Sequence, residues 1–259
     1  MTMDSAALQA KRPHSAFRKL MESETKLAWR FPIGLVLGVA VPVLVIVIFG
    51  SVPQMNHAEK KFGGLTYFSV YFPILIAISF AFLALISLPT HLASYREQGI
   101  LRRMATTPVP PRWMLSAQLI INLVLAAMAL GILVTVGIVA FGLAAPKEPA
   151  GFVLALVLTV AALFAIGLWI SAFARTAGGA GGIGQLFLYP SLFFAGLWVP
   201  EQVMATWLRD ISECTPTGAG VRAMQSAMQG TFPPAQSLLV LCAYTLVFGV
   251  LAVRFFRWE

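Results

Sequence analysis

The histidines and cysteines of this chain are too scattered to form a metal site or a hydrolytic active site. His14, His57 and His91 all lie outside the predicted membrane spans, so no intramembrane Ser-His or HExxH arrangement can be assembled from them. Cys214 and Cys242 have no histidine nearby, and we expect no disulfide, because one falls in a predicted loop and the other in an apolar segment. We therefore expect no catalytic residue and no bound metal.

Three glycines match the spacing of a dinucleotide-binding loop. Gly179, Gly181 and Gly184 satisfy GxGxxG, but that motif requires a preceding β-strand and an acidic residue about twenty positions later. A long apolar segment precedes it here, which favours a flexible turn leading into a helix whose small residues permit close packing. No GxxxxGK[ST] occurs in the sequence, so we expect no P-loop hydrolysis and no cofactor bound by this chain.

The composition is that of a chain that uses lipid as its solvent. Apolar residues make up 59% of the 259 residues, charged residues 11%, and the mean hydropathy is +0.83. Six intervals of 25 to 34 residues carry no charge, and each holds one spanning helix of roughly 20 residues. The predicted fold is all-α and polytopic: a cytoplasmic segment 1–30, then a six-span domain 31–259 with spans at about 33–50, 65–88, 114–143, 152–174, 183–199 and 237–253.

The charges predict an orientation. With six spans, thirteen of the 18 Lys and Arg residues fall on the side that holds both termini, and five fall on the other. By the positive-inside bias, both termini are cytoplasmic. We expect the protein to lie in the plasma (inner) membrane. The net charge of +8 does not indicate nucleic acid, because the basic residues are not interleaved with exposed aromatic residues. No charge lies within a predicted span, so work against a gradient must be driven from elsewhere.

Two amphipathic segments lie outside the spans. Phe17, Leu20 and Met21 begin an apolar stripe at helical spacing that Glu24 interrupts, which predicts a helix in the inner interface; an ordinary juxtamembrane basic cluster is the alternative. The extracellular segment 200–236 carries a second stripe, which predicts one or two short helices resting in the outer leaflet. That stripe consists of Val203, Trp207, Leu208 and Ile211.

The most polar interruption between apolar runs is the predicted cytoplasmic loop 91–113. It reads as a short helix from Ser94 to Arg103, followed by a stiff elbow at Pro108, Pro110 and Pro111. Gly99 permits close approach by another chain. A plainer interpretation is that this basic loop only fixes the orientation of the protein.

The order of these parts resembles the permease subunits of type-2 ABC exporters, the class that includes the daunorubicin-resistance permeases. Their cytoplasmic loop carries an acid, a glycine, a Leu-Arg pair and a Thr-Pro, matched here by Glu97, Gly99, Leu101, Arg102, Arg103, Thr107 and Pro108. The end of their fifth span and the helix that follows are matched by Phe194, Gly196, Pro200, Trp207, Leu208 and Pro216. The chain departs from the family's usual Glu-Arg-Glu-x-Gly-Thr at 94–96 and at Ile100.

The resemblance implies a half-transporter that pairs with a second permease protomer and with two copies of a cytoplasmic ABC ATPase, which would bind the ATP and Mg. Loop 91–113 would couple to the ATPase, and the second and fifth spans would line the translocation path or the dimer interface. The implied path or interface residues are Tyr67, Tyr71, Phe72, Ser79, Gln185, Tyr189, Phe194 and Trp198. The implied extracellular gate consists of Pro200, Trp207, Leu208 and Pro216.

The implied function is ATP-driven export of hydrophobic or amphipathic cargo, such as a drug, a lipid or a glycolipid, by a transport subunit that is not itself an enzyme. Multidrug efflux with antibiotic resistance falls within this class, and polysaccharide export is a close variant. From another class, a membrane scaffold or passive carrier without an ATPase remains open. A neighbouring reading frame with a P-loop and an ABC signature would separate these hypotheses.

Overall fold

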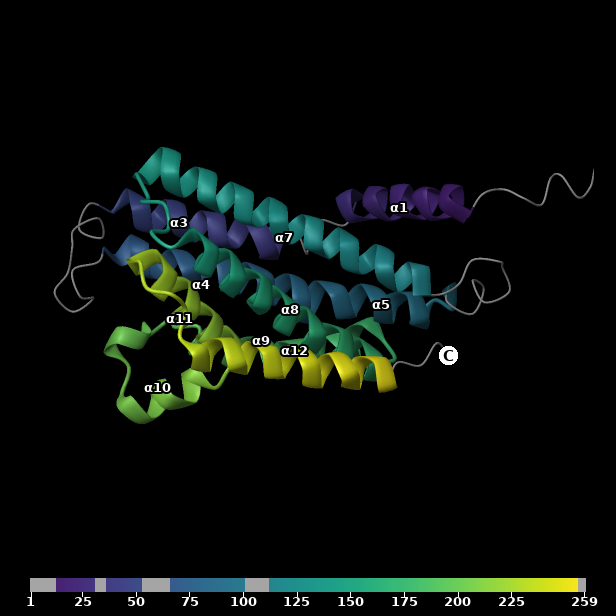
Figure 1. Cartoon of the computed structure of the whole chain (residues 1–259). Helices are drawn as coiled ribbons and strands as arrows, with labels where there is room; N and C mark the ends of the chain where they lie inside the picture. The colour runs from purple at the N-terminus through teal and green to yellow at the C-terminus, as the bar shows by residue number, and fades with distance from the viewer. Residues whose placement is uncertain (1–12, 31–35, 53–65, 101–111, 256–259) are drawn as a thin grey trace, which may run out of the picture.

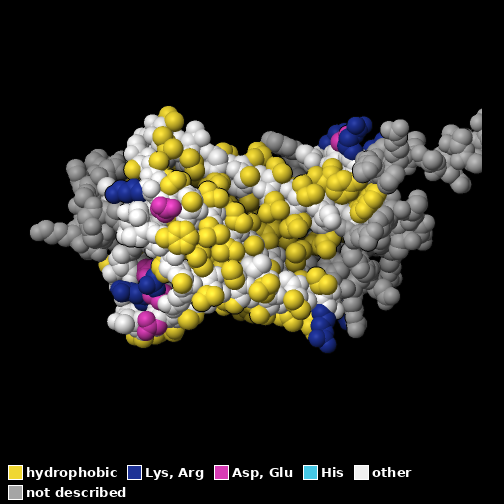
Figure 2. All heavy atoms as spheres, in the orientation of Figure 1, with side chains coloured by type: hydrophobic (Ala, Val, Ile, Leu, Met, Phe, Trp, Pro, Cys, Tyr) yellow, Lys and Arg dark blue, Asp and Glu magenta, His cyan; other side chains and the backbone are white. Residues whose placement is uncertain are grey.

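A computed structural model describes residues 13–30, 36–52, 66–100 and 112–255, and the elements in these ranges are helices (Figure 1). The predicted all-α fold is therefore confirmed for this part of the chain. Figure 2 shows hydrophobic side chains over the middle of the visible face, with charged side chains confined to its two ends. We name these ends after one residue at each. The Glu97 end is the one at which the described chain ends, at Phe255, and the Arg222 end is the one at which α10 (Thr206–Glu213) lies.

Four described helices are long and apolar enough to cross a membrane, and they correspond to the predicted second, third, fourth and sixth spans. They are Tyr67–Glu97, Trp113–Phe141, Pro149–Phe173 and Ala235–Phe255. The other two predicted spans are also helical but shorter or less apolar: η1 (Val36–Ala40) continues into α3 (Val41–Ser51), and α9 covers Ala177–Phe194. The six-span count therefore stays a prediction.

The helix Tyr67–Glu97 forms the centre of the bundle. It comprises α4 (Tyr67–Phe82), the π-helical turn η4 (Leu83–Ser87) and α5 (Leu88–Glu97). It begins where the Thr66 hydroxyl accepts a hydrogen bond from the Ser69 amide at 3.1 Å, which satisfies one of the otherwise unpaired first-turn amides. Nearly every residue from Val70 to Leu85 is buried. Figure 1 shows α3 and α7 (Arg112–Phe141) on one side of it and α8 (Pro149–Phe173), α9 and α12 (Ala235–Phe255) on the other.

The end of this helix corrects the predicted helix from Ser94. Residues 91–97 are not a separate loop helix but the last turns of the central helix, because its apolar face, including Leu92, Ala93 and Tyr95, stays buried against the bundle. The helix ends at Gln98, and Gly99 follows with φ 67°, a left-handed conformation that glycine adopts without strain.

The other long helices are α7 (Arg112–Phe141), α8 (Pro149–Phe173) and α12 (Ala235–Phe255). Pro149 occupies the first position of α8, where no intrahelical amide bond is lost. Gly167 and Gly184 bring α8 and α9 against the backbone of η4: a Cβ added at Gly167 would lie 1.9 Å from the Ala84 carbonyl oxygen, and one at Gly184 would lie 2.1 Å from that of Leu85. The central helix, α8 and α9 are therefore in backbone-level contact.

The segment between α9 and α12 contains the 3-10 turn η5 (Glu201–Val203), α10 (Thr206–Glu213) and α11 (Pro216–Gln229). The exposed Trp207 and Ile211 of the predicted stripe lie on α10, whereas Val203, also exposed, lies outside that helix in η5. The expectation of helices resting on the outer leaflet is wrong for α11, which is buried among α4, α8 and α12. Its small side chains, such as Ala219 and Ala223, allow this close packing.

The N-terminal helix α1 (Pro13–Arg30) packs against α7. Figure 1 draws it beside the part of α7 nearest the Glu97 end. Phe17 meets the ring of Trp113 edge-on, with ring centroids 5.6 Å apart. Arg18, Lys19 and Lys26 are exposed, as the predicted stripe requires. Its place within a membrane interface stays a prediction.

Candidate functional site

Three consecutive residues at the end of the central helix bind three different helices. Tyr95 donates a hydrogen bond to Glu24 of α1, Arg96 donates to carbonyls at the end of α8, and Glu97 accepts from the first amide of α9. We call these residues the 95–97 junction. Because they point in different directions from one helix end, any displacement of that end acts on all three neighbours.

Arg96 lies at the carboxyl end of α8. Its Nη1 donates to the Ser171 carbonyl oxygen at 2.9 Å and to that of Ala174 at 2.5 Å. The last carbonyls of a helix have no intrahelical partner and carry the negative end of the helix dipole. A guanidinium placed there satisfies these oxygens and complements their charge.

Glu97 makes the opposite interaction at the start of α9. Its Oε2 accepts a hydrogen bond from the Ala177 amide at 2.9 Å, while the Thr176 hydroxyl accepts from the Gly179 amide at 3.1 Å. A carboxylate at a helix N-terminus contributes roughly 0.3–1 kcal/mol when exposed. Arg96 and Glu97 together hold both sides of the short α8–α9 turn: the positive Arg96 binds the end of α8, and the negative Glu97 binds the start of α9.

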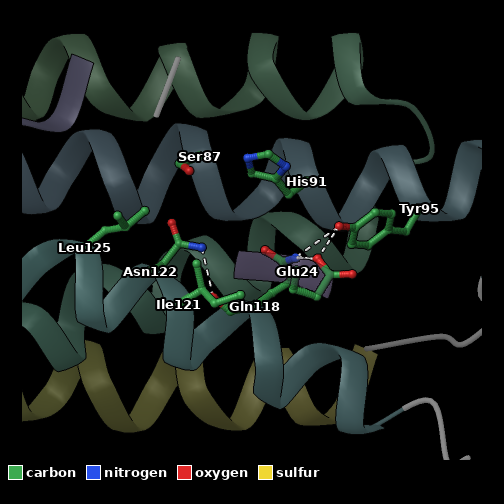
Figure 3. Close-up of a pocket in the computed structure, with 8 residues that line it drawn as sticks. All are labelled: Glu24, Ser87, His91, Tyr95, Gln118, Ile121, Asn122 and Leu125. Carbon is green, nitrogen blue, oxygen red and sulfur yellow. Dashed lines mark hydrogen bonds between the residues drawn. The ribbon is translucent and has the colours of Figure 1, made fainter. Parts of the chain in front are cut away.

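Tyr95 ties α1 to the bundle through a buried carboxyl group. Glu24 is 7% exposed, and it accepts hydrogen bonds from the Tyr95 hydroxyl and from Nε2 of Gln118 on α7 (Figure 3). Burial raises the pKa of Glu24, and the two hydrogen bonds partly oppose that rise. Glu24 is thus the residue that fixes α1 against the central helix and α7.

A small cavity of about 20 Å³ adjoins this cluster and is also lined by Ser87, His91 and Asn122 (Figure 3). Asn122 Nδ2 donates to the Gln118 carbonyl oxygen at 2.9 Å, and its buried Oδ1 has no hydrogen-bond partner among the described residues. This volume suits one or two water molecules rather than cargo. The cluster therefore positions helices and does not form a transport pocket.

The structure places only part of the predicted coupling segment. Glu97 and Gly99 are described above, at the end of the central helix. Leu101, Arg102, Arg103, Thr107 and Pro108 lie outside the described residues. In the described chain, no group of three His, Cys, Asp or Glu residues could hold a metal ion.

The predicted path residues fall into two separate groups. Tyr71, Phe72 and Ser79 are buried within the bundle of this one chain: the Tyr71 ring packs edge-on against Phe49, with centroids 4.9 Å apart, and Ser79 Oγ donates to the Leu75 carbonyl oxygen at 3.0 Å. Outside this group, Tyr67 and Phe194 are half-buried, whereas Gln185, Tyr189 and Trp198 are exposed. Their assignment to a path or dimer interface stays a prediction.

The predicted gate residues surround the junction of α9 with α10 and α11. Pro200 and Pro216 are buried, Leu208 is half-buried, and Trp207 is 66% exposed. Ser212 Oγ donates to the Phe194 carbonyl oxygen at 2.7 Å, which ties α10 to the end of α9. Whether these residues open and close a path is not tested by this arrangement.

Comparison with known proteins identifies one family. The family described as ABC-2 type transporter matches residues 15–229, well over half of the chain. No curated protein matches the sequence.

Proposed function

This chain belongs to the ABC-2 type transporter family, and we propose that it is the membrane subunit of an ATP-driven exporter in which the 95–97 junction passes force from a separate ATPase to the helices. Members of this family are transport components rather than catalysts. The apolar helices and the family together make the chain a membrane protein and a permease. The observation that carries the coupling proposal is the 95–97 junction itself.

The proposed mechanism is the movement of a rigid unit. An ATPase that displaces residues 98–111 pulls on the adjoining junction. Arg96 and Glu97 hold the α8–α9 turn, and Gly167 and Gly184 hold α8 and α9 against η4. The central helix, α8 and α9 therefore move together, because packed interiors transmit displacement rather than absorb it.

The moving surface is the exposed side of α9, which carries Gln185, Leu186 and Tyr189. We propose that it faces the second protomer and the cargo, so that its displacement opens the path between the two subunits. The uncharged, apolar spans favour hydrophobic or amphipathic cargo such as a drug, a lipid or a glycolipid. The excess of basic residues on the side of the termini supports a cytoplasmic Glu97 end. By analogy with the family, we place the chain in the plasma (inner) membrane, with ATP and Mg on two partner ATPase subunits.

The test is reconstitution with the cognate ATPase and comparison of Glu97→Ala with Gln98→Ala. Both side chains are exposed at the same helix end, but only Glu97 bonds the start of α9. In the Glu97 variant, ATPase association and ATP turnover should persist, while cargo moved per ATP falls roughly two- to five-fold, as the loss of about 0.3–1 kcal/mol for an exposed carboxylate at a helix N-terminus predicts.

Equal transport per ATP in the two variants would refute force transfer through Glu97. Uphill transport by the purified chain without ATP or a partner would refute the ATP-driven exporter itself. The two failures are distinguishable, because the second requires no variant.

A further inference from the structure

A second cavity, at the Arg222 end, is lined entirely by polar side chains. It has a volume of about 200 Å³ and lies between η5, α10 and α11. Its lining residues are Glu201, Gln202, Arg209, Arg222, Gln225, Ser226 and Gln229. A lining without any apolar side chain is unsuited to a hydrocarbon chain and suited to a ligand rich in hydrogen-bonding groups.

The charges of this cavity balance one another. Arg222 forms an ion pair with Glu213 and approaches the Glu201 carboxylate at 3.8 Å, and Arg209 Nε donates to the Glu201 carbonyl oxygen at 3.2 Å. Figure 2 shows acidic and basic side chains side by side at this end of the molecule. The lining holds two arginines and one glutamate, and Glu213, which pairs with Arg222 from outside the lining, balances the second arginine, so the site with its ion-pair partner has no excess charge to attract an anion or a cation.

The amide groups supply donors and acceptors without charge. Gln225 is 6% exposed; its Nε2 donates to the Val70 carbonyl oxygen, and its Oε1 accepts from Gln202 Nε2, both at 3.0 Å. The remaining oxygen of Gln202, Oε1, is buried with no hydrogen-bond partner among the described residues. A buried acceptor of this kind gains most from a ligand that brings a hydroxyl or amine donor.

The position of the cavity relative to the membrane follows from the two faces of α10. Trp207 and Ile211 expose an apolar face, whereas Arg209 lines the cavity from another face of the same helix. A helix with one apolar and one polar face lies at the boundary between headgroups and acyl chains. The cavity is thus placed at the level of lipid headgroups.

We propose that this cavity binds an uncharged polyhydroxylated group, the chemistry of a sugar, carried by a glycolipid whose headgroup is received here during export. The binding step stands on the cavity alone, whereas its part in export rests on the proposed function. An anionic headgroup would need arginines that are not already balanced by neighbouring carboxylates, and a cationic one would need carboxylates that are not already balanced by arginines.

The experiment measures lipids retained by the full-length chain purified in nanodiscs, using native mass spectrometry. The nanodiscs contain equal amounts of a monoglucosyl diacylglycerol, the same diacylglycerol without sugar, phosphatidylglycerol and phosphatidylcholine. The glucosyl lipid should be retained at least five-fold over each of the other three. Equal retention of the sugar-free lipid, or preference for the anionic lipid, would overturn the proposal.

Matched variants locate the site. Gln229 is exposed at the end of α11 and lines the cavity, whereas Gln236 is exposed at the start of α12 and does not. Gln229→Leu should lower retention of the glucosyl lipid about five-fold, the equivalent of roughly 1 kcal/mol for one lost hydrogen bond. Gln236→Leu should leave it unchanged. Equal retention by both variants would remove the cavity from the explanation.

Two further arms separate the source of the sugar and the role in export. Displacement of the glucosyl lipid by free methyl glucoside would assign the site to a soluble sugar, and its failure would assign it to the intact glycolipid. Retention of the glucosyl lipid without ATP-driven export of it, in a complex that exports other cargo, would overturn the export role and leave the binding site standing.

Discussion

The close contact between α9 and η4 can be tested with two glycines on one helix. A Cβ added at Gly184 would lie 2.1 Å from the Leu85 carbonyl oxygen, whereas one at Gly182 meets nothing within 4 Å. Both positions are inside α9, so alanine brings the same gain in helix propensity at each, about 1 kcal/mol. The variants differ only in what the new methyl group meets.

The expected effects have opposite signs. Gly182→Ala should stabilise the protein by up to about 1 kcal/mol. At Gly184 the obstacle is backbone, which cannot rotate away as a side chain could, so overpacking should cost about 3 kcal/mol, the upper part of its usual range. After the gain in propensity, Gly184→Ala should destabilise the protein by about 2 kcal/mol, which lowers the unfolding midpoint by roughly 4–8 °C.

The assay is thermal unfolding of both variants and the parent in one detergent, followed by tryptophan fluorescence and by loss of the monodisperse peak. Midpoints that rise together would show that α9 does not approach the carbonyl of Leu85. The same pair also tests the rigid unit, because Gly184→Ala should reduce transport per ATP more than Gly182→Ala at a temperature where both are folded.

Three further predictions concern other parts of the chain. Burial raises the pKa of Glu24 above its usual 4.5, so docking of α1 should be strongest below pH 4.5 and weaken as pH rises through that raised pKa. Hydrogen exchange of α1 should show this slope, and Glu24→Gln should abolish it, whereas an unchanged slope in the variant would show that Glu24 is not the group that titrates. A membrane-impermeant maleimide applied to intact cells should label the exposed Cys214, because the Arg222 end is predicted to be extracellular; labelling only after lysis would reverse the orientation. Arg222→Gln should lower the free energy of unfolding in detergent by about 2 kcal/mol, which is less than the roughly 3–5 kcal/mol of a fully buried pair because the Arg222 side chain is 31% exposed. Adding Glu213→Gln should recover most of this loss, and no recovery would mean that the ion pair is not its cause.

The helical architecture was predictable because charge-free intervals can only be accommodated by spanning helices in lipid. Glu97 was singled out because it matches the acid in the cytoplasmic loop of the family that the chain resembles, and its part in coupling stays a prediction. Its partner was not predictable, because the amide of Ala177 is a backbone group and leaves no trace in the sequence. The same holds for Arg96, whose partners are carbonyl oxygens.

The sequence indicated that Glu24 makes a buried contact, but it did not indicate with which residues. Glu24 interrupts an apolar stripe, which indicates a buried polar contact, but its partners Tyr95 and Gln118 are 71 and 94 residues away. Only the packing of three helices brings them together. The buried position of α11 was missed for a different reason: its glycine, Arg, Gln and Ser residues lower its mean hydropathy, so a search for long apolar segments passes over a helix that is buried because its side chains are small.

The π-helical turn Leu83–Ser87 has a consequence for how this family member can vary. Such a turn accommodates one residue more than a regular turn, and each residue of an α-helix advances the side-chain direction by about 100°. Deleting one residue within this turn would restore a regular helix and leave the directions of Tyr95, Arg96 and Glu97 nearly unchanged. Deleting one residue from the regular helix between Leu88 and Ser94 would instead swing all three by about 100°, away from α1, α8 and α9. Insertions and deletions should therefore be excluded between residues 88 and 97, whereas the loss of one residue is tolerated between 83 and 87, and substitutions at the exposed Gln98 leave the angular phase of the junction intact.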